Sequence, residues 1–127
     1  MSKTTVLFYQ EADGRSPVLA WLEELRQMDV NAYVKCRAAI GRLKEMGHEL
    51  RRPTADVLRD GIHELRARKG RVNYRLLYFF HGRSVAIVTH GLTKEDVVPA
   101  ADIERALRRK ALFEADTEKH TYAFGLE

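Results

Sequence analysis

The residues best suited to chemistry lie in the middle of the chain, where charged and apolar side chains alternate. Glu64, Arg66 and Arg75 fall on this stretch, and His90 follows shortly after it. An arginine guanidinium stays charged at physiological pH and can bind two phosphate oxygens at once. A histidine can take up or release a proton near neutral pH. The combination predicts a site that binds a phosphate and moves protons beside it.

Arginines with a proton-transfer group suit the cleavage of RNA by its own 2′-hydroxyl. That reaction needs a base for the hydroxyl, cations for the charge that develops on phosphorus, and an acid for the leaving oxygen. DNA lacks this nucleophile, and its hydrolysis by water usually recruits metal ions. The chain has a single cysteine, Cys36, and no cluster with metal-ligand spacing, so we expect neither a metal nor a cofactor.

Residues 62–80 predict a β-hairpin that would position these side chains. The alternating pattern is interrupted at Lys69-Gly70 and then resumes, which indicates two strands and a tight turn. A two-residue turn at these positions sets Glu64 opposite Arg75, and Arg66 opposite Asn73.

A second turn at residues 81–82 would bring a third strand, residues 84–90, onto the same sheet. His90 then lies opposite Asn73, and alternation adds Arg68 and Arg71 to this polar face. The opposite face collects the apolar side chains that helices would cover, Val85 and Ile87 among them.

Two explanations of the polar face remain open at this point. A cross-strand salt bridge would be sufficient for Glu64 and Arg75. It does not account for the other basic side chains there, namely Arg66, Arg68, Arg71 and His90. Like charges so close together cost stability unless an anion normally sits among them. Arg51 and Arg52, in the polar connection before the hairpin, either bind phosphate as well or are merely solvated.

Composition and charge limit the classes of protein to consider. The chain has 127 residues, of which 45% are hydrophobic and 31% charged, as in a soluble protein with one domain over residues 1–127. No apolar run approaches the roughly 20 residues that cross a bilayer, and no secretory segment begins the chain, so we expect a cytoplasmic protein without membrane contact. Residues 42–83 hold eleven Lys or Arg against five Asp or Glu, whereas the whole chain carries only +4. A phosphate-rich partner would suit this cationic middle.

The remaining patterns predict an α+β fold. We expect an antiparallel-rich sheet of about four strands, packed with an N-terminal helical hairpin and a C-terminal helix. Ser16 and Pro17 are typical of a helix start. The expected elements besides the hairpin are a strand at 6–9, helices at 17–28, 31–46 and 100–115, and a tail from about 117 to 127 that we expect to be mobile.

Several motifs in this order resemble the RelE/ParE toxin superfamily, and within it the phage-derived, HigB-like branch. They are GIHELR at 61–66, YRLLYFF at 74–80 and HGLTK at 90–94, followed by Pro99 and a helix rich in Arg and Lys. The likeness runs over roughly residues 5–115, and the ordered set is more specific than any one motif.

The resemblance implies the toxin of a type II toxin–antitoxin system. Such toxins are commonly mRNA endoribonucleases that cut translated messages on the ribosome, and a small antitoxin, often with a helix-turn-helix, neutralises them. Carried onto this sequence, Arg66 and Arg75 would bind the scissile phosphate. Lys94 would add positive charge or act as the acid, and His90 or Glu64 would be the base. Tyr122 and Phe124 lie beyond a long helix, so the base-stacking role of a C-terminal aromatic is not transferred.

Two rival functions compete with the nuclease. One is a ParE-like inhibitor of DNA gyrase, which acts by binding alone, and the other is a non-catalytic module that binds nucleic acid or a partner. The basic and proton-transfer side chains Arg66, Arg75, His90 and Lys94 favour the nuclease.

Overall fold

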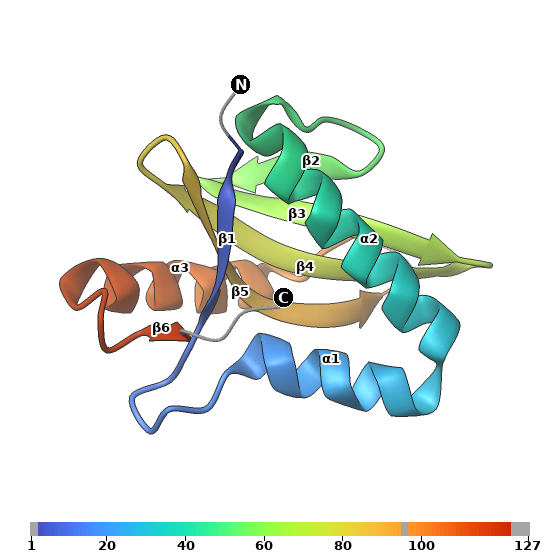
Figure 1. Cartoon of the computed structure of the whole chain (residues 1–127), viewed down its shortest axis with the longest axis horizontal. Helices are drawn as coiled ribbons and strands as arrows, with labels where there is room; N and C mark the ends of the chain where they lie inside the picture. The colour runs from blue at the N-terminus through green and yellow to red at the C-terminus, as the bar shows by residue number, and fades with distance from the viewer. Residues whose placement is uncertain (1–2, 95–96, 123–127) are drawn as a thin grey trace.

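The computed structural model describes residues 3–94 and 97–122 as a sheet with helices on both faces (Figure 1). Its elements are β1 (Thr5–Tyr9), α1 (Pro17–Met28), α2 (Val30–Met46), the short 3-10 helix η1 (Gly47–Glu49), β2 (Ala55–Arg59), β3 (Ile62–Lys69), β4 (Val72–His81), β5 (Val85–Lys94), α3 (Ala100–Ala115) and β6 (Thr121–Tyr122). None of the helices in these residues is both long and apolar enough to span a membrane.

The sheet is mixed and has the strand order β2-β3-β4-β5-β1-β6. β1 runs parallel to β5, and the other neighbours are antiparallel. The protein is α+β as expected, but the prediction of about four strands is wrong, because the described part of the chain contains six paired strands. β2 arises from a polar connection whose residues find their partner on β3, and β6 from the tail, whose Thr121 and Tyr122 pair with β1.

The two N-terminal helices do not form the antiparallel hairpin that we expected. β1 precedes them, and a single residue, Asp29, both ends α1 and caps α2 by accepting from the backbone N–H of Ala32. An antiparallel pair usually needs a loop of about 2–5 residues, so α1 and α2 diverge instead (Figure 1). The start of α1 matches the prediction, since Ser16 accepts from Leu19 and Pro17 follows it.

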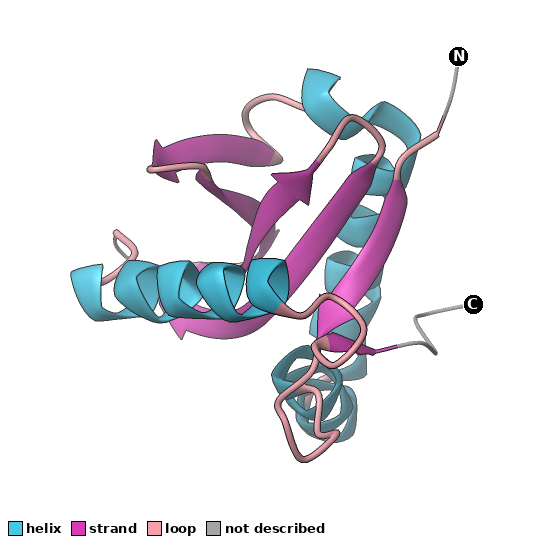
Figure 2. Ribbon diagram, turned by 90° about the vertical axis from the view of Figure 1, so that its left-hand side faces the viewer, coloured by secondary structure: helices cyan, strands magenta, loops and turns pink. Residues whose placement is uncertain are grey.

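Helices cover the sheet on both sides, and each side has its own core. α1 and α2 pack on one face against side chains such as Leu65, Leu76 and Val88. α3 crosses the other face, where Leu77 and Phe79 contribute to a second core (Figure 2). The candidate residues Glu64, Arg66, Arg75 and His90 belong to the α3 side by strand alternation.

The register of the β3–β4 hairpin differs from the expected one by a shift of the turn. Gly70 and Arg71 form the turn, so Arg66 lies opposite Arg75, and Glu64 opposite Leu77. The predicted partners are therefore wrong. Each residue of β3 therefore pairs with a residue of β4 two positions away from the expected one. A shift by two positions does not change which side of the sheet a side chain is on, so the polar side chains still share one face.

The β4–β5 pairing contains a bulge that reverses the faces of β5. Tyr78 pairs with Val88, whereas Leu77 pairs with His90, so Thr89 is the extra residue. His90 is thus opposite Leu77 rather than Asn73, and the strand that was expected to end at residue 90 continues to Lys94. His81 pairs with Val85, so the turn has three residues, 82–84, one more than expected, and Val85 and Ile87 lie on the α3 side, contrary to expectation. The bulge then returns His90 to the expected polar face.

Candidate functional site

Glu64 is a buried carboxylate held by two arginines of the hairpin. Its side chain is 4% exposed, and Arg66 donates to its Oε2 from Nε at 3.0 Å and from Nη2 at 2.7 Å. Arg75 lies across the hairpin from Arg66 and brings Nη1 to within 3.4 Å of Glu64 Oε1. The structure thus unites the three residues that the sequence singled out on this hairpin.

Two buried polar atoms in this group have no hydrogen-bond partner among the described residues. They are Glu64 Oε1 and Arg75 Nε, and both belong to side chains that are at most 10% exposed. Buried polar atoms normally have a partner, and an unpaired one indicates a water, a ligand or a catalytic role. Glu64 Oε1 therefore accepts no hydrogen bond from the described residues, although Arg75 Nη1 lies 3.4 Å away, and the Nε–H of the same arginine is also without an acceptor.

Asp56 of β2 extends this group toward solvent. Its Oδ2 accepts from Arg66 Nη2 at 3.3 Å and from Arg52 Nε at 2.9 Å. Hydrogen bonds with Arg52, the largest influence, lower the pKa of Asp56. We call Asp56, Glu64, Arg66 and Arg75 the glutamate cluster. It is buried at Glu64 and Arg75 and partly exposed at Arg66, whose side chain is 31% exposed.

A cavity of about 510 Å³ adjoins Arg66 where α2, β3 and the loop at residues 53–54 meet. We call it the cationic groove. Its charged lining residues are Lys35, Arg42, Arg66 and Arg68, and no acidic residue is among the described residues that line it. Arg42 donates to the Thr54 hydroxyl and Arg68 to the carbonyl of Gly70, so neither cation is neutralised by a described carboxylate. The groove is suited to bind anions.

Two of the groove cations were not among the predicted site residues. Lys35 and Arg42 are exposed residues of α2 and are seven positions apart, which places them on the same side of the helix. That spacing is the signal in the sequence. It indicates a shared anion site with Arg66 and Arg68 only once α2 is known to pack beside β3.

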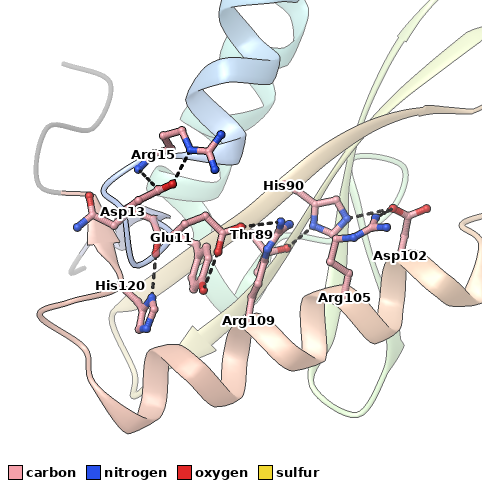
Figure 3. Close-up of polar contacts among 11 residues, drawn as sticks. Glu11, Asp13, Arg15, Thr89, His90, Asp102, Arg105, Arg109 and His120 are labelled. Atoms are coloured by element: carbon pink, nitrogen blue, oxygen red, sulfur yellow. Dashed lines mark hydrogen bonds and ion pairs between the residues drawn. The ribbon is translucent and has the colours of Figure 1, made fainter.

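His90 lies in a second group of charges beneath α3, shown in Figure 3. Its Nε2 is 3.2 Å from Asp102 Oδ1, and its Nδ1 is 3.0 Å from the hydroxyl of Thr89. Arg105 also donates to Asp102, at 2.8 Å. Leu77 separates His90 from Glu64 in the same row of the sheet, so the structure does not join His90 to the glutamate cluster.

Burial keeps the imidazole of His90 neutral. Burial and, next in size, the Arg109 guanidinium lower the pKa of His90 from 6.5 to about 4, although Asp102 acts in the opposite direction. Arg109 in turn donates to Glu11 at 3.0 Å, and its guanidinium lies 5.7 Å from the centre of the Tyr9 ring. We call Glu11, His90, Asp102, Arg105 and Arg109 the histidine cluster.

The remaining predicted residues lie around these groups. Arg68 and Asn73 line the cationic groove, and Arg71 is exposed in the β3–β4 turn. Arg51 and Arg52 are exposed and line a different cavity near η1. The backbone of Lys94 pairs with Asn73, while its side chain, like all of Phe124, lies outside the described residues.

The arrangement can bind a phosphate and hold a carboxylate next to it. Among residues 3–94 and 97–122, no three His, Cys, Asp or Glu side chains meet in a way that could hold a metal ion. The glutamate cluster supplies a fixed guanidinium pair and an acceptor oxygen, and the groove supplies further cations. Of the predicted site residues, the structure brings Glu64, Arg66 and Arg75 into contact, and it adds Asp56 and the α2 cations beside them.

Comparison with known proteins gives one family. The model of the phage derived protein Gp49-like (DUF891) family matches residues 23–111, from the second half of α1 into α3. No curated protein matches the chain. The matched segment covers well over half of the sequence and includes the glutamate cluster, the groove and His90. The chain therefore belongs to the Gp49-like family of phage-derived proteins, a RelE/ParE-like toxin-family domain.

Proposed function

We propose that this protein is the RNA-cleaving toxin of a type II toxin–antitoxin system, of the HigB-like branch. One observation carries the proposal: a groove lined by four cations and no described acidic residue opens beside the buried Glu64–Arg66–Arg75 group. Family membership is consistent with a toxin at this coarse level. RNA phosphates are the anions that such a groove would take in a toxin of this kind.

The proposed chemistry uses the 2′-hydroxyl of the substrate as the nucleophile. The 2′-oxygen forms a new bond to phosphorus, its proton passes to Glu64 Oε1, and the bond from phosphorus to the 5′-oxygen breaks. The products are a 2′,3′-cyclic phosphate and a 5′-hydroxyl. Arg66 and Arg75 stabilise the charge that develops on the phosphate oxygens. Lys94 donates the proton to the leaving 5′-oxygen.

Glu64 is preferred over His90 as the base because of where each group lies. Glu64 Oε1 accepts no hydrogen bond from the described residues, and Glu64 neighbours the groove cation Arg66. Both ring nitrogens of His90 have neighbours within hydrogen-bonding distance, and α3 covers the ring. We assign His90 to holding the start of α3 through Asp102.

The proposed partners are messenger RNA on the ribosome and a cognate antitoxin, both met in the cytoplasm. An antitoxin that blocks this site would present acidic side chains to the groove or cover it, because complementary charge favours that contact. It would also raise the melting temperature of the toxin by mass action.

The central test removes three of the four groove cations and leaves Arg66 and the rest of the glutamate cluster unchanged. We expect the triple variant Lys35→Ala, Arg42→Ala, Arg68→Ala to cleave RNA at least about tenfold more slowly than wild type. The matched control is Arg83→Ala, Arg108→Ala, Lys119→Ala, which removes three exposed cations elsewhere. Cleavage is followed on message RNA with and without ribosomes, and circular dichroism checks the fold.

The chemical step is tested separately with Glu64→Gln, which keeps the shape of the side chain. We expect cleavage to fall by about 10²–10⁴, the usual contribution of general acid–base catalysis. Product ends decide the mechanism, because 5′-phosphate ends would contradict attack by the 2′-hydroxyl. Intact RNA together with inhibited DNA supercoiling would favour gyrase inhibition over the nuclease.

A further inference from the structure

A second cavity, of about 540 Å³, lies near η1 on the side of the sheet that α2 covers. Aromatic rings form one part of its lining, and we call it the aromatic cavity. The rings are those of His48, His63, Tyr78 and Phe80. Ligand cavities of about 300–1,000 Å³ take small organic groups, so one nucleotide fits in a space of this size.

The rings are arranged as flat surfaces rather than as a disordered apolar lining. The exposed ring of His48 stacks on Phe80, with ring centres 3.6 Å apart and planes 20° apart. His63 stacks on Tyr78 at 5.1 Å and meets Phe80 edge-on. Nucleobases bind to such ring faces through stacking, largely whatever their sequence.

The polar groups of the aromatic cavity suit the edge of a base. His63 is half-buried, and burial, followed by the charges of His48 and Arg51, lowers its pKa. A neutral imidazole offers one donor and one acceptor. Arg51 and Arg52 are exposed on the lining, where they can contact the phosphates that flank a base.

The aromatic cavity and the cationic groove share one wall. Residues 50–52 and 55–57 line the cavity, while Pro53 and Thr54, between them, line the groove. Asp56 lines the cavity and accepts from Arg66 of the groove at 3.3 Å. One strand of RNA can therefore place a phosphate in the groove and the base of a neighbouring nucleotide in the cavity.

We propose that the aromatic cavity is a nucleobase subsite, in which an unstacked base of the RNA binds against the ring of His48, which Phe80 supports from the other side. The proposal rests on the proposed function and deepens it. It predicts that the toxin grips the bases of its substrate as well as the backbone. An aromatic side chain of a partner protein is the rival occupant.

The test compares two probes that differ only in their bases. One is a five-nucleotide RNA with 2′-O-methyl riboses, which cannot be cleaved, and the other is the same backbone without bases. We expect wild type to bind the first about tenfold more tightly, as one stacked base allows. His48→Ala should abolish that ratio and leave affinity for the abasic probe unchanged. Fluorescence anisotropy measures both affinities.

His81→Ala is the matched control, because His81 is exposed and packs edge-on against Phe113 outside the cavity. It should keep the tenfold ratio. The groove variant Lys35→Ala, Arg42→Ala, Arg68→Ala should weaken both probes equally. If His48→Ala does not fold, wild-type NMR decides: adenosine and cytidine monophosphates should shift the ring signals of His48 and His63 but not those of His81.

The outcomes separate the subsite from the function on which it rests. If wild type binds both probes equally, or His48→Ala keeps the wild-type ratio, the subsite is wrong and the phosphate groove stands. If wild type binds neither probe, both proposals are overturned. A His48→Ala variant that loses only antitoxin binding points to the rival occupant and overturns the subsite.

Discussion

The glutamate cluster and the histidine cluster lie on the same face of the sheet and use the same residue types in different ways. In the histidine cluster, Arg105 pairs with Asp102 and Arg109 with Glu11, so each guanidinium has its own carboxylate. In the glutamate cluster, Arg66 and Arg75 share Glu64, and only Arg66 also contacts Asp56. Further cations in the groove have no described carboxylate at all.

This difference in carboxylate partners shows which arginines stabilise the fold and which can still bind an anionic ligand. A cation that is paired with a carboxylate of its own, as Arg105 and Arg109 of α3 are, has little attraction left for an external anion. A cation held in place by a buried carboxylate, with neighbours of its own sign, has unbalanced charge that an anion can neutralise. Residue type alone would rank Arg66 of β3 and Arg109 of α3 alike. Their carboxylate partners separate them, although Nη1 of Arg109 is also buried without a hydrogen-bond partner among the described residues.

The largest expected effect comes from breaking the glutamate cluster at its centre. Glu64→Ala leaves Arg75 buried without its counter-charge, so we expect the free energy of unfolding to fall by about 3–5 kcal/mol. Asp102→Ala is the matched change in the histidine cluster. It leaves a neutral imidazole and the part-exposed Arg105, and we expect about 1–2 kcal/mol. Urea unfolding at pH 7 measures both, and equal losses would contradict the distinction between the clusters.

The next effect is a dependence on pH that belongs to the histidine cluster. The pKa of His90 is about 4 in the folded protein and 6.5 in the unfolded chain, so between these values the unfolded chain binds more protons. Stability is therefore full above pH 6.5 and falls as the pH drops toward 4. From pH 6.5 to 5 the loss should be on the order of 2 kcal/mol.

His90→Gln removes this titration and serves as the comparison, with His63 titrating in both proteins. Urea unfolding at pH 7, 6 and 5 should give a flatter pH profile for the variant than for wild type. Identical profiles would mean that His90 is not held neutral by burial under α3.

Local patterns were sufficient to predict much of the hairpin and its polar face. Alternation in residues 62–80 fixes which side chains share a face, and this survived a turn at Gly70–Arg71 because the shift preserves parity. The α1 start also followed from Ser16 and Pro17, since a cap is a local interaction.

Other features depend on contacts between distant segments and leave no local pattern. The extra residue of the turn at 82–84 reverses the faces of Val85 and Ile87, and the bulge at Thr89 reverses the alternation again before His90, so only the first part of β5 was assigned to the wrong sides. β2 pairs with β3 from a stretch with little strand character. The ion pairs that cover His90 depend on α3 crossing the sheet, which its sequence does not specify. The sequence therefore predicted which residue types occur in the candidate site, but not which side chains they contact.

A smaller effect sharpens the comparison through anion binding. Inorganic phosphate at about ten times its dissociation constant should add about 1.4 kcal/mol to the stability of wild type, because it binds only the folded protein. The groove variant Lys35→Ala, Arg42→Ala, Arg68→Ala should lose this gain, and the control Arg83→Ala, Arg108→Ala, Lys119→Ala should keep it. Melting temperatures in phosphate and in chloride of equal ionic strength measure the gain. A loss in both variants would assign it to net charge instead of the groove.

The smallest effect concerns the outer edge of the glutamate cluster. Arg52 pairs with Asp56 at 2.9 Å, but its side chain is 75% exposed, so water and salt screen the attraction. We expect Arg52→Ala to lower the free energy of unfolding by no more than about 0.5 kcal/mol, as for most exposed ion pairs. Because Asp56 keeps its contact with Arg66, the buried part of the cluster should hold its geometry. Urea unfolding in low and in high salt measures the change. A decrease in the free energy of unfolding that does not depend on salt and is as large as that of Asp102→Ala would mean that Arg52 stabilises the buried part of the cluster.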